Sequence, residues 1–336
     1  MKVNIVGPGP LFGRIELFFG GIEVAAKNLA LRLNEEGIKA DYNGKANDYD
    51  IVNLHVILDP FSLKRLKRKT KVITHGHVTP QDMKGGVIGH RWYNWAAKAY
   101  LRWYYSQADQ LVSPSSFGKS SLREIGVTAP IEVISNGINL AKFAADPSRK
   151  GLFRKEYNLP DSKLIVSIGS LFPRKGLFDV VNLAKKMPDH TFVWVGTPLF
   201  IYHPFFLKAQ MGSIPPNMHF TGYYPGSILD VYADADIIFF PTYVENQGIP
   251  TLEAAACQVP LVVRDIPVFN EWLTHGENCL MGSSLKEYEK VIIQLLNDNE
   301  LSEKLTAKAF FDVQQHSHEK AISKIITLYE KVLSDN

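Results

Sequence analysis

Short apolar runs alternate along the chain with segments in which apolar residues return at helical spacing. The apolar runs predict strands near residues 2–7, 38–42, 50–54, 71–74, 110–113 and 131–134, and a second series near 164–169, 191–195, 218–221, 236–240 and 261–263. Strands that alternate with helices form parallel sheets with helices on both faces. The pattern therefore predicts an α/β chain with two doubly wound, Rossmann-like halves.

The length and composition fit two soluble domains. At 336 residues the chain exceeds the size at which a single core stops growing, and its 46% hydrophobic and 21% charged residues are ordinary for a globular protein. Cys257 and Cys279 are its only cysteines, and we see no secretory segment or membrane-spanning apolar run. We expect a cytoplasmic protein without a disulfide framework.

Charge is distributed unevenly along the chain. Residues 1–150 hold 21 Lys and Arg against 13 Asp and Glu, a net charge of +8, whereas the remainder carries −5. The densest basic segment is residues 64–71, whose six cations include Lys64, Arg65, Lys67 and Arg68. The first half is therefore expected to attract an anionic partner.

A predicted aromatic helix follows this basic segment. On a helical wheel Arg91, Lys98 and Arg102 form a cationic stripe, and aromatic residues that include Trp92 and Trp103 cover the opposite arc. Together the two faces suit a lipid headgroup interface. The alternative is that the aromatic side chains pack on the first sheet. Nucleic acid is not expected as a partner, because the overall charge of +3 is small and no binding motif is visible.

A strand, a short polar loop and the start of a helix follow one another after Ile237. The helix is expected to begin at about Pro250, because proline is favoured at the first helical position. Such a start leaves the amides of Gly248, Ile249 and Thr251 free at the carboxyl end of the strand, where open α/β sheets bind ligands. We expect an anion there.

Two carboxylates flank this helix start. Glu245 lies in the loop, and Glu253, eight positions later, is expected in the first helical turn. Carboxylates accept hydrogen bonds from hydroxyl groups, so beside an anion site they suit the ribose and sugar of a sugar nucleotide. The alternative is a solvated loop residue and an ordinary helix-start carboxylate.

Two glycine-containing loops also follow predicted strands. Arg174 and Lys175 come just before a helix expected near Gly176, where cations and free amides would meet an anion together, although a solvated basic loop is the alternative. Gly20 and Gly21 end a loop after the first strand. That loop lacks a strict G-x-G-x-x-G pattern, so a dinucleotide site is not expected, and a plain tight turn remains possible.

His75 and His77 stand at the carboxyl end of the strand at 71–74. No third or fourth ligand stands at a recognisable spacing, so we expect no metal site; buried structural histidines are the alternative. Asp234 and Asp236 resemble an Asp-x-Asp metal motif, but they sit where a helix runs into a strand, and we interpret them as structural.

These motifs together resemble the retaining GT-B glycosyltransferases of family 4, and among them the bacterial diacylglycerol glycosyltransferases. The matching segments are Gly20–Glu23, Phe172–Gly176, Glu245–Glu253 and Arg264–Leu273. The resemblance implies two Rossmann-like domains facing each other across a cleft. Residues 1–150 would bind the acceptor and the membrane, residues 151–317 would bind the nucleotide sugar, and a last helix at 318–336 would cross back to the first domain.

The resemblance also implies roles for individual residues. Glu253 would hold the ribose, Arg174 and Lys175 the diphosphate, and Glu245 the sugar together with the amides of Gly248–Pro250. Thr251 belongs to the same donor-binding segment. Ser170 stands where many members of the family have arginine, which leaves more of the phosphate charge to Arg174.

Further roles implied by the resemblance lie in the first half. Gly20 and Gly21 would approach the donor phosphate and sugar. His75 or His77 would contact the transferred sugar, and the spacing from His77 to Asp82 resembles that of the lipid-glycosylating members.

The implied activity is retaining, metal-independent transfer of a hexose from UDP-glucose or UDP-galactose to diacylglycerol or a glycosyl-diacylglycerol. The donor is a substrate, and no cofactor is expected. The enzyme would be cytoplasmic and peripherally associated with the inner face of the cell membrane, with an anionic membrane surface as a partner. Two alternatives remain: a family member with a soluble or polysaccharide acceptor, and a non-catalytic GT-B scaffold protein.

Overall fold

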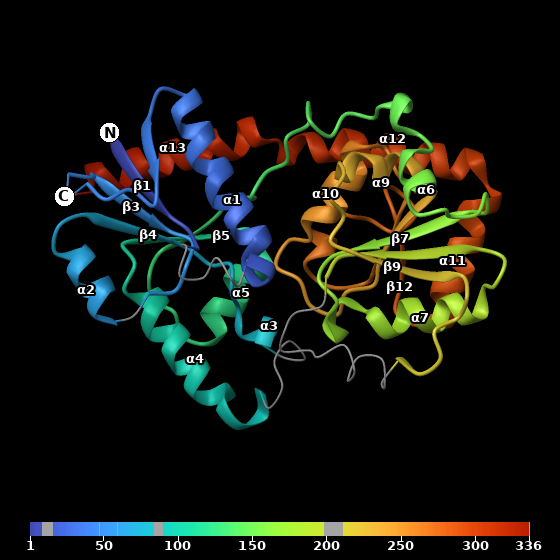
Figure 1. Cartoon of the computed structure of the whole chain (residues 1–336). Helices are drawn as coiled ribbons and strands as arrows, with labels where there is room; N and C mark the ends of the chain where they lie inside the picture. Colours follow the sequence, from blue (N-terminus) through green and yellow to red (C-terminus); the bar gives the residue numbers. More distant parts are fainter. Residues whose placement is uncertain (9–15, 47, 59, 84–89, 198–210, 336) are drawn as a thin grey trace. The chain divides into compact units, whose positions relative to one another are not determined.

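The computed structural model describes residues 1–8, 16–46, 48–58, 60–83, 90–197 and 211–335, without the side chains of 16–21, 82–83 and 90–94. The chain forms two compact units (Figure 1). Unit 1 comprises the described residues of Met1–Lys84, Gly89–Gly137 and His318–Asn336, and unit 2 those of Ile138–Ser317. The boundary between the two units lies between Gly137 and Ile138, earlier in the chain than the boundary at residue 150 that the sequence suggested.

Unit 1 contains a six-stranded parallel sheet in the order β2-β1-β3-β4-β5-β6. Its strands are β1 (Lys2–Val6), β2 (Lys39–Tyr42), β3 (Ile51–Leu54), β4 (Lys71–His75), β5 (Gln110–Ser113) and β6 (Ile131–Val133). Its helices are α1 (Glu16–Glu35), α2 (Pro60–Lys67), α3 (Pro80–Met83), α4 (His90–Ser106), α5 (Ser116–Glu124) and α13 (His318–Ser334).

Two hydrophobic cores cover the faces of this sheet. Residues of α1 and α13, such as Leu33 and Ile325, pack with Val3 and Ile5 on one face. Residues of α2, α4 and α5 form the core on the other face, as Figure 1 shows. The C-terminal helix α13 is therefore a structural part of the N-terminal unit.

Unit 2 repeats this architecture with a six-stranded parallel sheet in the order β12-β11-β10-β7-β8-β9. Its strands are β7 (Leu164–Ile168), β8 (Thr191–Val195), β9 (Met218–Gly222), β10 (Ile237–Phe240), β11 (Leu261–Arg264) and β12 (Leu280–Gly282). Its α-helices are α6 (Leu152–Glu156), α7 (Leu177–Lys186), α9 (Ile228–Asp234), α10 (Ile249–Ala256), α11 (Leu285–Asn297) and α12 (Asn299–Val313). Short 3-10 helices are η2 (Pro147–Arg149), η3 (Pro173–Lys175), η4 (Phe269–Glu271) and η5 (Gln314–His316).

The predicted fold class and all eleven predicted strands are confirmed, with small shifts at their ends. β12 was missed, because Leu280–Gly282 is too short to show a periodic pattern. The start of the first helix was wrong. α1 begins at Glu16, so Gly20 and Gly21 lie within the helix and not in the loop before it.

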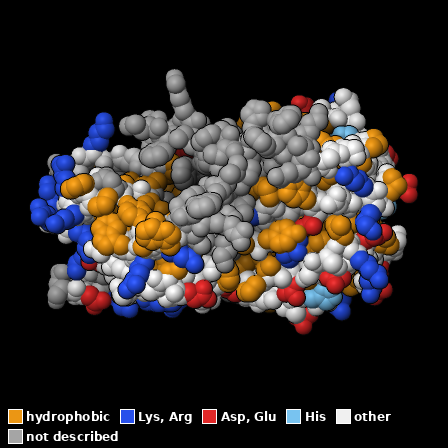
Figure 2. All heavy atoms as spheres, turned by 90° about the horizontal axis from the view of Figure 1, so that it is seen from below, with side chains coloured by type: hydrophobic (Ala, Val, Ile, Leu, Met, Phe, Trp, Pro, Cys, Tyr) orange, Lys and Arg blue, Asp and Glu red, His pale blue; other side chains and the backbone are white. Residues whose placement is uncertain are grey.

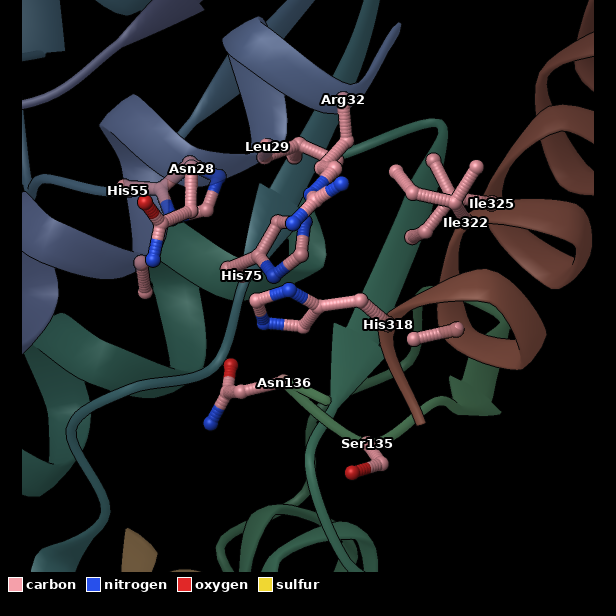
Figure 3. Close-up of a pocket in the computed structure, with 12 residues that line it drawn as sticks. Asn28, Leu29, Arg32, His55, His75, Ser135, Asn136, His318, Ile322 and Ile325 are labelled. Carbon is pink, nitrogen blue, oxygen red and sulfur yellow. The ribbon is translucent and has the colours of Figure 1, made fainter. Parts of the chain in front are cut away.

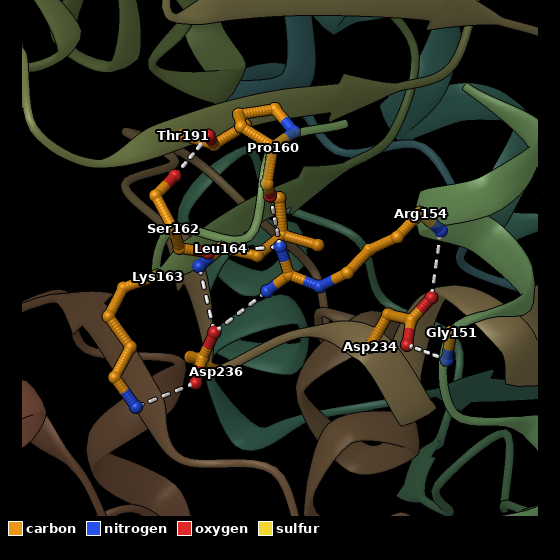
Figure 4. Close-up of polar contacts among 9 residues, drawn as sticks. All are labelled: Gly151, Arg154, Pro160, Ser162, Lys163, Leu164, Thr191, Asp234 and Asp236. Atoms are coloured by element: carbon orange, nitrogen blue, oxygen red, sulfur yellow. Dashed lines mark hydrogen bonds and ion pairs between the residues drawn. The ribbon is translucent and has the colours of Figure 1, made fainter. Parts of the chain in front are cut away.

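The Asp-x-Asp segment is structural, as predicted (Figure 4). Asp234 accepts hydrogen bonds from the amides of Gly151 and Arg154 at the start of α6. Asp236 accepts from the Leu164 amide at 2.8 Å and pairs with the Arg154 guanidinium at 3.1 Å. The two carboxylates therefore fix α6 and the start of β7, the first strand of the unit 2 sheet.

Within the described residues, no helix combines the length and the apolar character needed to cross a bilayer.

Candidate functional site

The order of the unit 2 strands reverses between β7 and β10. These strands are parallel neighbours, with Ile165 opposite Ile237, and the chain continues outward from them in opposite directions. The loops that follow the two strands therefore meet at the same edge of the sheet. Ligands bind at such switch points in open α/β sheets.

The two loops are joined by several contacts. The Tyr243 amide donates a 2.8 Å hydrogen bond to the Arg174 carbonyl, and the Arg174 guanidinium donates one of 3.0 Å to the Val244 carbonyl. Lys175 forms an ion pair with Glu245. The sequence-predicted cations and the first carboxylate are thus brought together.

Close packing at this edge requires glycine at two positions. Gly176 has φ 83°, and a Cβ atom there would lie 2.4 Å from the Pro241 carbonyl oxygen. Gly248 has φ 77°, and its Cβ would lie 2.7 Å from the Phe269 ring. Both conformations are in the left-handed region, which other residues rarely adopt.

The charge of Glu245 is maintained by its neighbours. Burial raises the pKa of this carboxyl, but Lys175 and Arg174 outweigh burial and lower it overall. Glu245 is therefore ionised at neutral pH, and its charge neutralises part of the cationic pair.

The helix start agrees with the prediction except at one amide. α10 begins at Ile249, with Gly248 as its N-cap and Pro250 in its first turn. The Thr251 amide donates to the Gly248 carbonyl at 2.8 Å, so the prediction that this amide is free was wrong. The amides of Gly248 and Ile249 have no acceptor recorded within the described part of the chain.

Glu253 is the fifth residue of α10 and lies just beyond its first turn, so the prediction that it stands within the first turn was wrong by one position. Its Oε2 accepts a 2.6 Å hydrogen bond from the hydroxyl of the buried Tyr232. Burial raises the pKa of Glu253, although the Tyr232 hydrogen bond and Lys142 act in the opposite direction. Tyr232 was not anticipated, because it lies 21 positions before Glu253 and only the folded arrangement of α9 and α10 brings its hydroxyl to this carboxylate.

His75 and His77 lie at the carboxyl end of β4 in unit 1, and the structure adds a third histidine, His55, directly after β3. One nitrogen of each ring lies within 4.8 Å of the other two. The His55 and His75 rings stack with centroids 4.0 Å apart. Burial lowers the pKa of His55 and His75 well below the usual value and that of His77 to about 4. All three imidazoles are neutral at pH 7.

A small pocket of about 40 Å³ adjoins these histidines (Figure 3). α1 contributes Arg32 to its lining, and α13 contributes His318. Asn136 and Ser135 line the opposite side. All the lining residues belong to unit 1.

The helices α2 and α4 present a basic and aromatic surface. Tyr100 donates to the Leu58 carbonyl at 2.8 Å, and Lys67 donates to the Gln107 carbonyl, so the two helices lie side by side. Figure 2 shows hydrophobic side chains gathered on the α4 side with Lys and Arg next to them. We define the basic aromatic patch as the exposed residues Phe61, Lys64, Arg65, Arg68, Trp95 and Trp103.

The aromatic residues of α4 divide between core and surface. Tyr104 and Tyr105 are 1% exposed, so the core interpretation holds for them, whereas Trp103 is 38% exposed. The sequence analysis missed two highly exposed aromatic residues of α2 and α4, Phe61 at 86% and Trp95 at 75%. Asp82 and Trp92 were also expected at the acceptor or membrane site, but their side chains are outside the part of the chain that the structure describes.

Two family models match the chain: Glycosyltransferase Family 4 over residues 43–142 and Glycosyl transferases group 1 over residues 149–311. The chain is 31% identical to the processive diacylglycerol alpha-glucosyltransferase of Acholeplasma laidlawii, over 89% of this chain and 90% of that one. It is 26% identical to the alpha-galactosylglucosyldiacylglycerol synthase of Streptococcus pneumoniae, over 84% and 77% of the two chains.

Solved structures show the same fold. The crystal structure of Anabaena HepE in complex with UDP and glucose matches with a TM-score of 0.77 at 16% identity, over the full length of both chains. Sucrose-phosphate synthase of Thermosynechococcus elongatus matches with a TM-score of 0.74 at 18% identity, over 98% of this chain and 82% of that one. The likeness in fold and the identity to curated relatives agree: the chain belongs to family 4 of the glycosyltransferases and has the GT-B fold.

Proposed function

We propose that this glycosyltransferase transfers a hexose from a UDP-sugar, UDP-glucose or UDP-galactose, to diacylglycerol or a glycosyl-diacylglycerol. The observation that carries the proposal is the switch point of unit 2. There the loops after β7 and β10 bring two cations, two carboxylates and a helix start to one edge of the sheet.

Each part of a UDP-sugar has a suitable partner at this edge. Arg174 and Lys175 supply positive charge for the diphosphate and stabilise it as the leaving group when the glycosidic bond breaks. These cations remove the need for a metal ion on the diphosphate. Glu253, held by Tyr232, accepts hydrogen bonds from the ribose, and Glu245 accepts them from the sugar. Because Lys175 is paired with Glu245, the diphosphate shares this cation with the carboxylate when the donor binds.

Transfer proceeds with retention in this proposal. The names of both lipid-modifying relatives specify alpha products, and UDP-glucose and UDP-galactose are themselves alpha-linked donors. The carboxylates do not form a glycosidase pair, since Glu253 is assigned to the nucleotide and leaves Glu245 without an acid/base partner. No side chain is assigned as a nucleophile, so the acceptor hydroxyl attacks from the face that the diphosphate leaves. His75 or His77 contacts the transferred sugar.

The basic aromatic patch supports a membrane acceptor. Phe61 and Trp95 are large apolar side chains with 86% and 75% exposure, and exposed cations of α2 lie beside Phe61. Aromatic side chains insert at the headgroup level while neighbouring cations attract anionic lipids. Peripheral binding would bring the enzyme to a substrate that does not leave the bilayer.

The proposal is tested by incubating the purified protein with several UDP-sugars and with vesicles that contain diacylglycerol. The expected product is an alpha-linked glycosyl-diacylglycerol, identified by mass spectrometry and by the anomeric coupling in its NMR spectrum. A beta product would refute retention, and transfer only to soluble sugars would favour the soluble-acceptor alternative. Absence of UDP release with every donor would favour the scaffold alternative.

A further inference from the structure

One ring nitrogen in the histidine cluster of unit 1 has no partner. His55 is 4% exposed, and its Nε2 has no hydrogen bond to any described residue. Its Nδ1 lies 2.8 Å from Nε2 of His77, so these two nitrogens share one proton. Buried polar atoms without a partner are rare in native proteins, and an ion or a water molecule commonly completes them.

The strand order explains why the three rings meet. His55 follows β3 and His75 ends β4, and these strands are adjacent and parallel, with Leu54 opposite Thr74. The His55 amide also donates to the Val6 carbonyl of β1 at 2.8 Å. The cluster therefore lies beside the β1/β3 switch point of unit 1, on backbone that the sheet fixes.

We propose that His55, His75 and His77 bind one divalent transition-metal ion, with Zn²⁺ as the reference ion. Imidazole nitrogens suit Zn²⁺, Co²⁺, Ni²⁺ and Cu²⁺ far better than Mg²⁺ or Ca²⁺. Three histidines leave a fourth position open to water, as in zinc sites with an exchangeable ligand. The adjoining pocket, lined by His55 and His75, gives room for that water.

Binding requires the rings to turn. Nitrogens about 2.1 Å from a tetrahedral ion lie roughly 3.4 Å apart. The 2.8 Å contact between His55 Nδ1 and His77 Nε2 must therefore break so that His55 can turn its unpartnered Nε2 toward the ion. The ligand nitrogens of the three rings, which lie up to 4.8 Å apart, must also move closer together. The His55 and His75 rings are only 18° from parallel, so their lone pairs must also be brought together. Rotation about the ring bond of histidine is soft, which allows this change without backbone movement.

Asn53 provides a support behind the ligands. Its side-chain amide lies 3.2 Å from His75 Nε2 and also contacts the Tyr329 hydroxyl of α13. This contact occupies Nε2 and leaves Nδ1 of His75 for the ion. The Asn53 Oδ1 has no hydrogen-bond partner among the residues that the structure describes. Turning the amide over would let this oxygen accept the Nε2 proton, the arrangement that commonly orients metal-binding histidines.

Calorimetric titration of the chelator-treated full-length protein with Zn²⁺, together with visible absorption on adding Co²⁺, tests the site. We expect one ion per chain. His55→Ala, His75→Ala and His77→Ala should each weaken binding by more than the roughly 10- to 100-fold expected for Asn53→Ala. His219→Ala, which changes a histidine of β9 in unit 2, is the matched control and should bind as the wild type does.

The proposal is overturned if the wild type binds no stoichiometric ion, or if the three cluster variants bind as tightly as the control. If a variant fails to fold, the wild-type titration still tests whether the protein binds one ion per chain. Failure of the metal proposal can be distinguished from failure of the donor-site proposal, because UDP affinity is measured in the same samples and depends on unit 2. If His75 or His77 contacts the sugar, Zn²⁺ should also inhibit transfer, and chelator should restore it.

Discussion

Replacing Glu253 by Gln should weaken UDP binding and stabilise the ligand-free protein at the same time. The carboxylate is buried, and the Tyr232 hydroxyl donates to one of its oxygens at 2.6 Å, which leaves the other for the ribose. A hydrogen bond to a charged acceptor contributes about 1.5–3 kcal/mol and one to a neutral acceptor about 0.5–1.5 kcal/mol. The expected loss is about 1–1.5 kcal/mol for each ribose hydroxyl, or roughly 5- to 150-fold in affinity for one or two hydroxyls.

The stability change has the opposite sign because burial raises the pKa of Glu253. A carboxyl whose folded pKa lies above its unfolded value destabilises the fold as pH rises through the interval between the two. Gln removes that charge but keeps an oxygen for Tyr232. Glu253→Gln should therefore gain stability at neutral pH, seen as a higher Tm. The gain should be present at pH 7 and absent at about pH 4, below the reference pKa of 4.5, where wild-type Glu253 is protonated in both states.

The assay combines UDP calorimetry at pH 7 with thermal unfolding at both pH values. Glu303→Gln, which changes an exposed carboxylate on α12, is the matched control and should alter neither quantity. Unchanged UDP affinity in Glu253→Gln would refute the ribose role. A Tm at pH 7 below that of the wild type would refute the assignment of Glu253 as a strained, functional carboxylate.

Three further predictions concern the same sites. Replacing Arg174 and Lys175 together by Ala should weaken UDP binding by at least about 3 kcal/mol, and calorimetry that finds unchanged affinity would contradict the diphosphate role. Tyr232→Phe should raise KM for the UDP-sugar more than it lowers kcat and should reduce discrimination against a 2′-deoxyribose donor, because the Glu253 carboxylate loses the hydrogen bond from the Tyr232 hydroxyl. Equal discrimination would leave Tyr232 a core residue. Replacing Phe61 and Trp95 by Ser should reduce binding to anionic diacylglycerol vesicles about 100-fold or more, because at least about 1.5 kcal/mol is lost for each of the two buried side chains, with UDP affinity unchanged. Cosedimentation equal to that of the wild type would refute insertion.

The sheets were predictable because their strands are short, apolar and bounded by turn residues. Parallel strands buried on both faces leave little ambiguity, and Gln110–Ser113 and Thr191–Val195 were located at their observed ends. The helix start at Ile249 followed from the proline beside it. The first helix was harder, because Gly20 and Gly21 normally indicate a loop and here lie inside α1.

The contacts within the sites were less accessible to sequence reasoning. His55 precedes His75 by twenty positions, and only the adjacency of β3 and β4 shows that they meet. That adjacency is the usual arrangement for consecutive strands, so a search of all residues that follow predicted strands would have found it. Trp95 was missed because a helical wheel gives the faces of a helix but not which face is covered. Phe61 was missed because the basic segment beside it was considered only for its charge.

The position of α13 has a consequence for how the protein is made. Its residues Ile325, Leu328 and Tyr329 are buried in the core of unit 1, yet they follow the whole of unit 2 in the chain. During synthesis the strands of the N-terminal unit are complete long before α13, which shares one face of that sheet with α1, has been made. Unit 2 can fold on the ribosome in this interval, while the part of the face that belongs to α13 remains exposed. A chain that stops before His318 would leave this apolar part uncovered permanently, so α13 is the element by which quality control can distinguish finished from unfinished molecules.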